Sequence, residues 1–134
     1  MVLLDTCAAI WLANGEPMSA ESLAAIRTAT RQGEVLISPV SAWEVGLLAA
    51  KSGVAFRPSP QAWFSSLLAL PGVIVAPLSS DAAIASSFLP GRPGGDPADR
   101  LLVATARELS ASIVTRDRRI LAYAAEGHVA AIRC

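Results

Sequence analysis

The chain has 134 residues, of which 53% are hydrophobic and 16% charged, and its formal net charge at pH 7 is zero. This composition argues against disorder, and the length fits one domain spanning residues 1–134. Zero net charge also argues against a broad electrostatic grip on nucleic acid, so contact with a polyanion has to be local.

Cys7 and Cys134 are the two cysteines. They do not suggest a disulfide framework and suit a reducing cytoplasm. No segment approaches the roughly 20 apolar residues of a membrane span, and the opening apolar run is too short for a signal sequence. We therefore expect a soluble cytoplasmic protein without a membrane partner.

The first part of the chain alternates short apolar runs with helical patterns. Asp5 closes the opening apolar run, and Ser19 is placed to cap a helix. In order, the predicted elements are a strand at residues 1–4, a helix at 8–13, a helix after Ser19 that runs to Gln32, a strand at 35–37 and a helix at 40–51.

The helix at residues 40–51 has a regular apolar stripe, which we expect to face the core. Glu44 is predicted to share this inward face because its neighbours one turn further on are apolar. Gly53 is placed to end the helix. The stripe consists of Val40, Trp43, Leu47 and Leu48.

The second part continues the alternation around one irregular loop. Residues 90–95 are rich in proline and glycine and are expected at the active site or the surface. Asp96 can cap the helix that follows, with Pro97 at its first position. The predicted elements are helices at 61–70, 81–87, 97–109 and 118–125, and strands at 73–75, 112–115 and 129–132.

Strands that alternate with helices are typical of a parallel sheet covered on both faces. We therefore predict an α/β fold, a three-layer α/β/α sandwich around a central parallel sheet. In such a sheet the functional crevice lies beyond the carboxyl ends of the strands.

Four carboxylates stand where apolar segments end or are interrupted. Asp5 and Asp117 follow predicted strands, Asp99 opens a helix at the same edge, and Glu44 lies one turn into its helix. Clustered carboxylates repel one another unless a cation neutralises them. Oxygen ligands suit Mg²⁺ or Mn²⁺, whereas a single histidine and two separated cysteines make zinc a poor fit.

Each acid also has a plainer explanation. Asp5, Asp99 and Asp117 could cap a helix or favour its dipole. Asp96 is placed as a cap more readily than as a ligand. Glu44 gains nothing from capping in mid-helix, and its alternative role is an ion pair with an arginine.

Four motifs follow one another in register along nearly the whole chain: Leu3-Leu4-Asp5-Thr6, Ser41-Ala42-Trp43-Glu44-Val45 with Lys51 and Gly53 after it, the run from Gly95 to Ala106, and Val114-Thr115-Arg116-Asp117. Together they resemble a PIN-domain ribonuclease of the VapC type, the toxin of a type II toxin–antitoxin system. Any one of these motifs alone would be weak evidence.

The resemblance implies a three-layer PIN-like fold and hydrolysis of RNA with Mg²⁺, for which Mn²⁺ could substitute. It also implies a homodimer and a cognate antitoxin protein that inserts a segment into the acidic groove. The implied catalytic and metal-binding acids are Asp5, Glu44, Asp99 and Asp117, with Asp96 as a further ligand and Thr6 and Thr115 as supporting residues.

Arg92, Arg100 and Arg116 lie beside these acids in sequence and could bind RNA phosphates. Their alternative is surface solvation or, for Arg100 and Arg116, an ion pair with an acid. Aromatic residues on the helices are expected in the core or an interface rather than as base-stacking platforms. These aromatic residues are Trp11, Trp43, Trp63 and Phe64.

Two other interpretations stay open. A catalytically silent PIN-like binding module would keep the fold, although the presence of all four acids does not favour it. A Mg²⁺-dependent phosphatase or a receiver-type domain also places an aspartate after the first strand. The phosphatase pattern wants a second aspartate where Cys7 stands, and a receiver wants a lysine where Arg116 and Asp117 follow a late strand.

Overall fold

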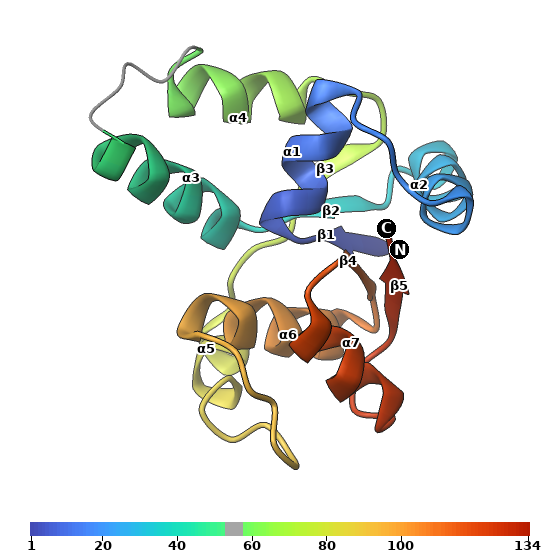
Figure 1. Cartoon of the computed structure of the whole chain (residues 1–134), viewed down its shortest axis with the longest axis vertical. Helices are drawn as coiled ribbons and strands as arrows, with labels where there is room; N and C mark the ends of the chain where they lie inside the picture. Colours follow the sequence, from blue (N-terminus) through green and yellow to red (C-terminus); the bar gives the residue numbers. More distant parts are fainter. Residues whose placement is uncertain (53–57) are drawn as a thin grey trace.

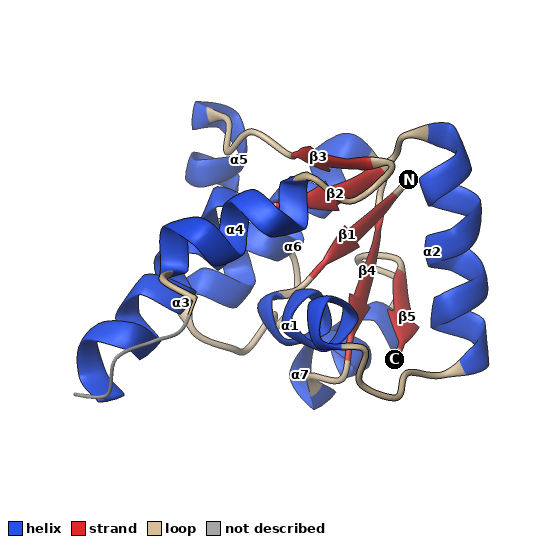
Figure 2. Cartoon of the chain, turned by 90° about the horizontal axis from the view of Figure 1, so that it is seen from above, coloured by secondary structure: helices blue, strands red, loops and turns tan. Residues whose placement is uncertain are grey.

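The computed structural model describes residues 1–52 and 58–134, and within them a five-stranded parallel sheet forms the centre of the molecule. The strand order is β3-β2-β1-β4-β5, with β1 in the middle. Figure 2 shows the sheet from above, with the strands fanned by their twist. The strands are β1 (Val2–Leu4), β2 (Val35–Ile37), β3 (Val73–Val75), β4 (Ser112–Thr115) and β5 (Ala131–Arg133).

Helices cover both faces of the sheet, which confirms the predicted three-layer architecture. In Figure 1, α1 to α4 lie above the sheet and α5 to α7 below it. The helices are α1 (Thr6–Asn14), α2 (Ala20–Gln32), α3 (Pro39–Ser52), α4 (Pro60–Leu68), α5 (Ser80–Ala85), α6 (Pro97–Leu109) and α7 (Arg118–Ala125).

The strands β1 and β2 are apolar throughout, and β4 is apolar at Ile113 and Val114, because both faces of the sheet are buried. Val2 and Leu4 point into the layer of α1, α2 and α4, whereas Leu3 points into the layer of α6 and α7. Side chains alternate along a strand, so a strand covered on both sides needs a continuous apolar run. This is why the short runs at β1, β2 and β4 could be identified from the sequence.

Most helix starts are set by a capping side chain. Asp5 accepts a hydrogen bond from Ala8 N, so α1 begins at Thr6, two residues before the predicted start. Ser19 and Asp96 cap α2 and α6 as predicted. The strand β5 begins at Ala131, two residues later than predicted. The predicted stop at Gly53 lies outside the described residues.

The predicted inward stripe of α3 is wrong in most of its members. Val40 is buried, but the exposed fractions of Trp43 and Leu48 are 53% and 54%, and that of Leu47 is 37%. The residues that α3 buries are Val40, Ser41 and Val45. An apolar stripe shows which residues share a helix face, but it cannot tell a core-facing stripe from one left open at the surface.

No helix in the described part of the chain is long and apolar enough to cross a membrane.

Candidate active site

The sheet reverses its winding between β1 and β4. From β1 the chain winds outward through β2 to β3, then crosses back to β4 on the other side of β1. Adjacent strands whose connections leave in opposite directions open a crevice at their carboxyl ends. Leu4 pairs with Val114 there, and Asp5 N donates to Val114 O at 3.1 Å.

Asp5 occupies the end of β1 and is 8% exposed. Its Oδ1 accepts from Ala8 N at 2.7 Å, and its Oδ2 accepts from the Thr115 hydroxyl. Thr115 is fully buried, and its Oγ1 also accepts from Asp117 N at 2.9 Å. Thr115 therefore links the two aspartates that follow β1 and β4.

Asp117 caps α7 and lines the crevice at the same time. Its Oδ1 accepts from Arg119 N at 2.8 Å and from Ile120 N at 3.1 Å. The capping role and the site role that the sequence left as alternatives for Asp5 and Asp117 therefore coexist. A single carboxylate has lone pairs enough for both.

Glu44 reaches the crevice from α3. Thr6 Oγ1 donates to Glu44 Oε1 at 2.6 Å and lies 3.0 Å from Ser41 Oγ. Ser41 is fully buried one turn before Glu44, and its hydroxyl contacts the Thr6 hydroxyl that binds Glu44. The sequence left an ion pair with an arginine as the alternative role of Glu44. Among the described residues no arginine lies within ion-pair distance of Glu44, so such a pair does not hold it.

Asp96 and Asp99 form a capping box at the start of α6. Asp96 Oδ1 accepts from Asp99 N at 2.9 Å, and Asp99 Oδ2 lies 3.4 Å from Asp96 N. Gly95 makes room for Asp99: its φ is +74°, and a Cβ at this position would lie 2.9 Å from Asp99 Oδ2. Asp99 faces the crevice, whereas Asp96 is exposed outside it.

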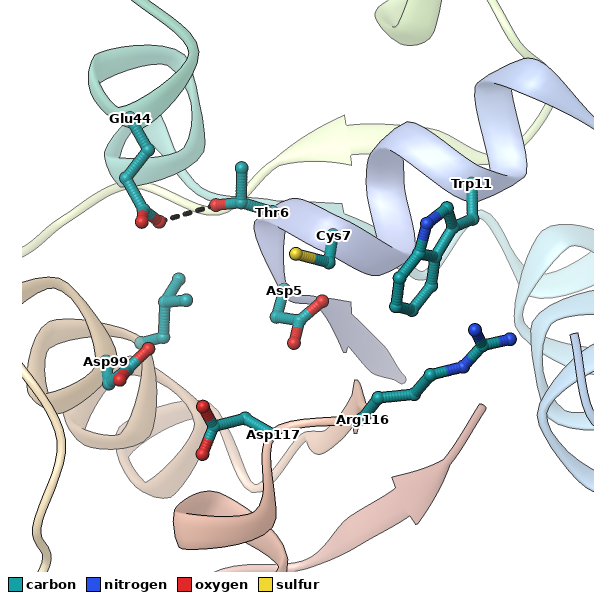
Figure 3. Close-up of a pocket in the computed structure, with 9 residues that line it drawn as sticks. Asp5, Thr6, Cys7, Trp11, Glu44, Asp99, Arg116 and Asp117 are labelled. Atoms are coloured by element: carbon teal, nitrogen blue, oxygen red, sulfur yellow. Dashed lines mark hydrogen bonds between the residues drawn. The ribbon is translucent and has the colours of Figure 1, made fainter. Parts of the chain in front are cut away.

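One cavity of about 250 Å³ collects Asp5, Glu44, Asp99 and Asp117 (Figure 3). Sequence reasoning missed Cys7, Trp11 and Leu102 as further lining residues and did not use Ser41. Spacing within the helices could have indicated them: Cys7 follows two predicted site residues, and Ser41 precedes Glu44 by three. The cavity is lined by Asp5, Thr6, Cys7, Trp11, Glu44, Asp99, Leu102, Arg116 and Asp117.

Burial and the repulsion between neighbouring carboxylates raise the pKa values of two acids in the cavity. Burial raises the pKa of Asp5, with smaller upward contributions from Asp117 and Glu44, while the Thr115 hydrogen bond opposes the rise. Burial, followed by the charges of Asp96 and Asp117, raises the pKa of Asp99 to about 6. Both shifts mean that negative charge in this cavity is costly without a cation.

The cavity offers a donor set that fits Mg²⁺ or Mn²⁺, since carboxylate and hydroxyl oxygens line it. As positioned, no three acidic, thiol or imidazole groups of the described residues could jointly hold one ion. Mg²⁺ does not need such a cage, because it usually keeps several waters and binds one or two carboxylates directly. The residues therefore fit an ion held partly through water.

The three arginines differ in position. Arg92 and Arg100 are exposed outside the cavity, and Arg100 Nε lies 3.5 Å from Gly94 O. Arg116 lines the cavity, but Nε and Nη2 each donate at 2.7 Å to a backbone oxygen, of Cys134 and Pro17. Neither Arg100 nor Arg116 pairs with an acid among the described residues.

Comparison with known proteins places the chain in a family. The profile of the PIN domain matches residues 2–126. The chain is 32% identical over 122 residues to "Ribonuclease VapC22" of Mycobacterium tuberculosis, covering 89% of this chain and 88% of that protein.

Solved structures agree on the fold. The structure of VapBC2 from Rickettsia felis bound to a promoter DNA fragment has a TM-score of 0.72 at 14% identity, covering 99% of this chain and 98% of that one. DNA-bound VapBC from Salmonella typhimurium gives 0.68 at 17% identity, with 99% and 98% covered. With β1 and β4 presenting acids at the reversal of the sheet, and with these matches along its length, the chain belongs to the PIN-domain family and is of the VapC type.

Proposed function

We propose that this protein is a metal-dependent endoribonuclease and the toxin of a toxin–antitoxin pair. The observation that carries the proposal is the convergence of Asp5, Glu44, Asp99 and Asp117 from four separate segments on one cavity. The similarity to a protein named a ribonuclease supports RNA as the substrate.

In this proposal Asp5, Glu44 and Asp99 would hold Mg²⁺, or Mn²⁺ in its place, partly through coordinated water, and Asp117 would hold a second ion or orient the attacking water. A bound divalent ion would acidify a water molecule and stabilise charge on the phosphoryl oxygens. Thr6 fixes the Glu44 carboxylate and Thr115 fixes that of Asp5. Asp96 acts on the ion only through Asp99, whose backbone it caps.

Substitution of the acids tests the proposal. Asp5→Asn and Glu44→Gln should each abolish Mg²⁺-dependent cleavage of an RNA pool, and excess EDTA should do the same to the unmodified protein. Glu21→Gln is the matched control, because Glu21 is an exposed acid in the first turn of α2. Cleavage that persists in EDTA, or in both acidic-site variants, would overturn the metal-dependent mechanism.

The proposed protein partner is a cognate antitoxin that places a segment in the acidic groove. An acidic cavity favours a neutral or basic segment, since a second acid would meet the charges that already raise the pKa of Asp99. The similar solved structures described as VapBC complexes support such a partner. A small DNA-binding reading frame immediately upstream of the gene, whose product copurifies with this chain, is the expected observation.

A homodimer in a reducing cytoplasm completes the proposal. Ile84 and Phe88, at α5 and just after it, are 63% and 80% exposed, and Ile74 on the edge strand β3 is 48% exposed. Such large exposed apolar side chains support a protein–protein interface. Light scattering should give the mass of a dimer at micromolar concentration, and a monomer would remove this part of the proposal.

A further inference from the structure

Trp11 stands in the wall of the acidic cavity and packs against the edge of the core. It lies one helical turn after Cys7 on α1, and both side chains line the cavity, so this face of α1 is turned toward the site. The indole is half-buried. Of the three tryptophans, Trp63 is buried in the core and Trp43 is exposed on α3, so Trp11 alone is placed beside the acids.

Arg116 holds the indole in place. Its guanidinium carbon lies 4.0 Å from the centre of the Trp11 ring, and its two hydrogen bonds to the Cys134 and Pro17 backbone oxygens anchor it there. A cation so placed attracts the electron-rich face of the ring. Figure 3 shows the indole between the Arg116 guanidinium and Cys7, and both Trp11 and Cys7 line the cavity.

The cavity therefore has two chemically different walls. Asp5, Asp99 and Asp117 form a negative wall, which a phosphate can approach only with a cation between them. Trp11 and Cys7 form an uncharged wall beside it, which repels no part of a nucleotide. An aromatic ring next to a phosphate site is the arrangement with which proteins stack unpaired RNA bases.

We propose that Trp11 is a specificity-determining residue that stacks a nucleobase adjacent to the scissile phosphate, and that Arg116 is a positioning residue that fixes the ring. This inference rests on the proposed ribonuclease function. Stacking accepts any base because every base has a π-face, so Trp11 selects for an unpaired base at one position rather than for its identity.

The test compares Trp11→Phe, which keeps an aromatic face, with Trp11→Leu, which keeps only apolar bulk. In Mg²⁺-dependent cleavage of a short single-stranded RNA, Trp11→Leu should raise KM about tenfold or more with little change in kcat, as loss of a base stack does. Trp11→Phe should stay within about threefold of the unmodified protein, because it still offers a ring. Trp43→Leu, the same substitution at an exposed tryptophan whose side chain does not line the cavity, should leave KM unchanged.

Substrates with a single abasic nucleotide complete the experiment. One abasic position beside the cleaved bond should raise the KM of the unmodified protein by the same factor as the Trp11→Leu substitution does. It should not raise the KM of the Trp11→Leu variant any further. The stacking role would be overturned, with cleavage left intact, if Trp11→Phe and Trp11→Leu raised KM equally. It would also be overturned if the abasic substrate raised the KM of Trp11→Leu by a further factor. Absence of cleavage by the unmodified protein would instead overturn the ribonuclease proposal itself, and the stacking role with it.

Discussion

Replacing Thr115 by valine should loosen the link between the two strand ends that carry the site. Thr115 Oγ1 donates to Asp5 Oδ2 and accepts from Asp117 N at 2.9 Å, at a fully buried position. Valine has nearly the same shape but makes neither hydrogen bond. Asp5 Oδ2 and Asp117 N would then each lose the partner that Thr115 provides at its buried position.

The magnitude follows from the two bonds. A hydrogen bond to a charged group contributes about 1.5–3 kcal/mol and a neutral one about 0.5–1.5 kcal/mol. Thr115→Val should therefore lower the free energy of unfolding by about 2–4 kcal/mol, which for a domain of this size lowers Tm by about 10 °C. Urea unfolding followed by circular dichroism, in EDTA at pH 7, measures the change.

A second effect concerns Asp5. The Thr115 hydrogen bond opposes the upward shift that burial gives the pKa of Asp5, so its loss should raise that pKa further. The carboxyl then ionises at higher pH. The pH at which Mg²⁺ reaches half of its stabilising effect should move upward in the variant, as thermal melts with and without the ion would show.

Thr105→Val is the matched control. Thr105 is also fully buried, but its hydroxyl donates only to Leu101 O, 2.8 Å away and one turn earlier in α6. A helix already uses that carbonyl, so the loss should be below about 1 kcal/mol. The reasoning about Thr115 is refuted if the two variants lose the same stability and the pH response of Mg²⁺ binding does not move.

Two further predictions concern α6 and its loop. In EDTA, the folded Asp99 carboxyl, with a pKa of about 6, binds its proton more tightly than in the unfolded chain, where the pKa is 3.8. Stability should therefore fall as pH rises between these values and level off above them, and Asp99→Asn should flatten that segment in urea titrations; equal slopes would contradict the shift. Gly95→Ala should displace Asp99 and lower RNA cleavage, whereas Gly94→Ala, with φ +58° and nothing nearer than 3.8 Å, should keep it. Both should lose about 1 kcal/mol to left-handed backbone strain, so equal activities would mean that Asp99 tolerates the added methyl.

Much of the fold could be predicted because its signals are local. The strands at 35–37, 73–75 and 112–115 and the helices at 97–109 and 118–125 have their predicted bounds, since buried runs and caps such as Asp96 mark them directly. The less accurate boundaries are those of α1, α4, α5 and β5, each two residues off at one end. The start of α1 depends on the conformation of Asp5, and the extent of β5 depends on pairing with β4.

The site was predicted in part. That Asp5, Glu44, Asp99 and Asp117 line one cavity was expected, but the reason given for Glu44 was not the right one. Glu44 was assigned to a face shared with Leu47 and Leu48, both of which are exposed. What turns Glu44 inward is the Thr6 hydroxyl, 38 residues away along the chain, and no local pattern reports such a contact.

The sequence by itself determined the alternation of strands and helices, the caps and the acids that follow β1 and β4, because each depends on neighbours a few residues apart. Only the tertiary structure decided how the acids are held together, that Asp96 stays outside the cavity, and that Trp11, packed against Arg116, forms an uncharged wall with Cys7. The physical reason is that these outcomes depend on strand order and on side-chain contacts between distant segments. Thr115 joining Asp5 across 110 residues is the clearest case.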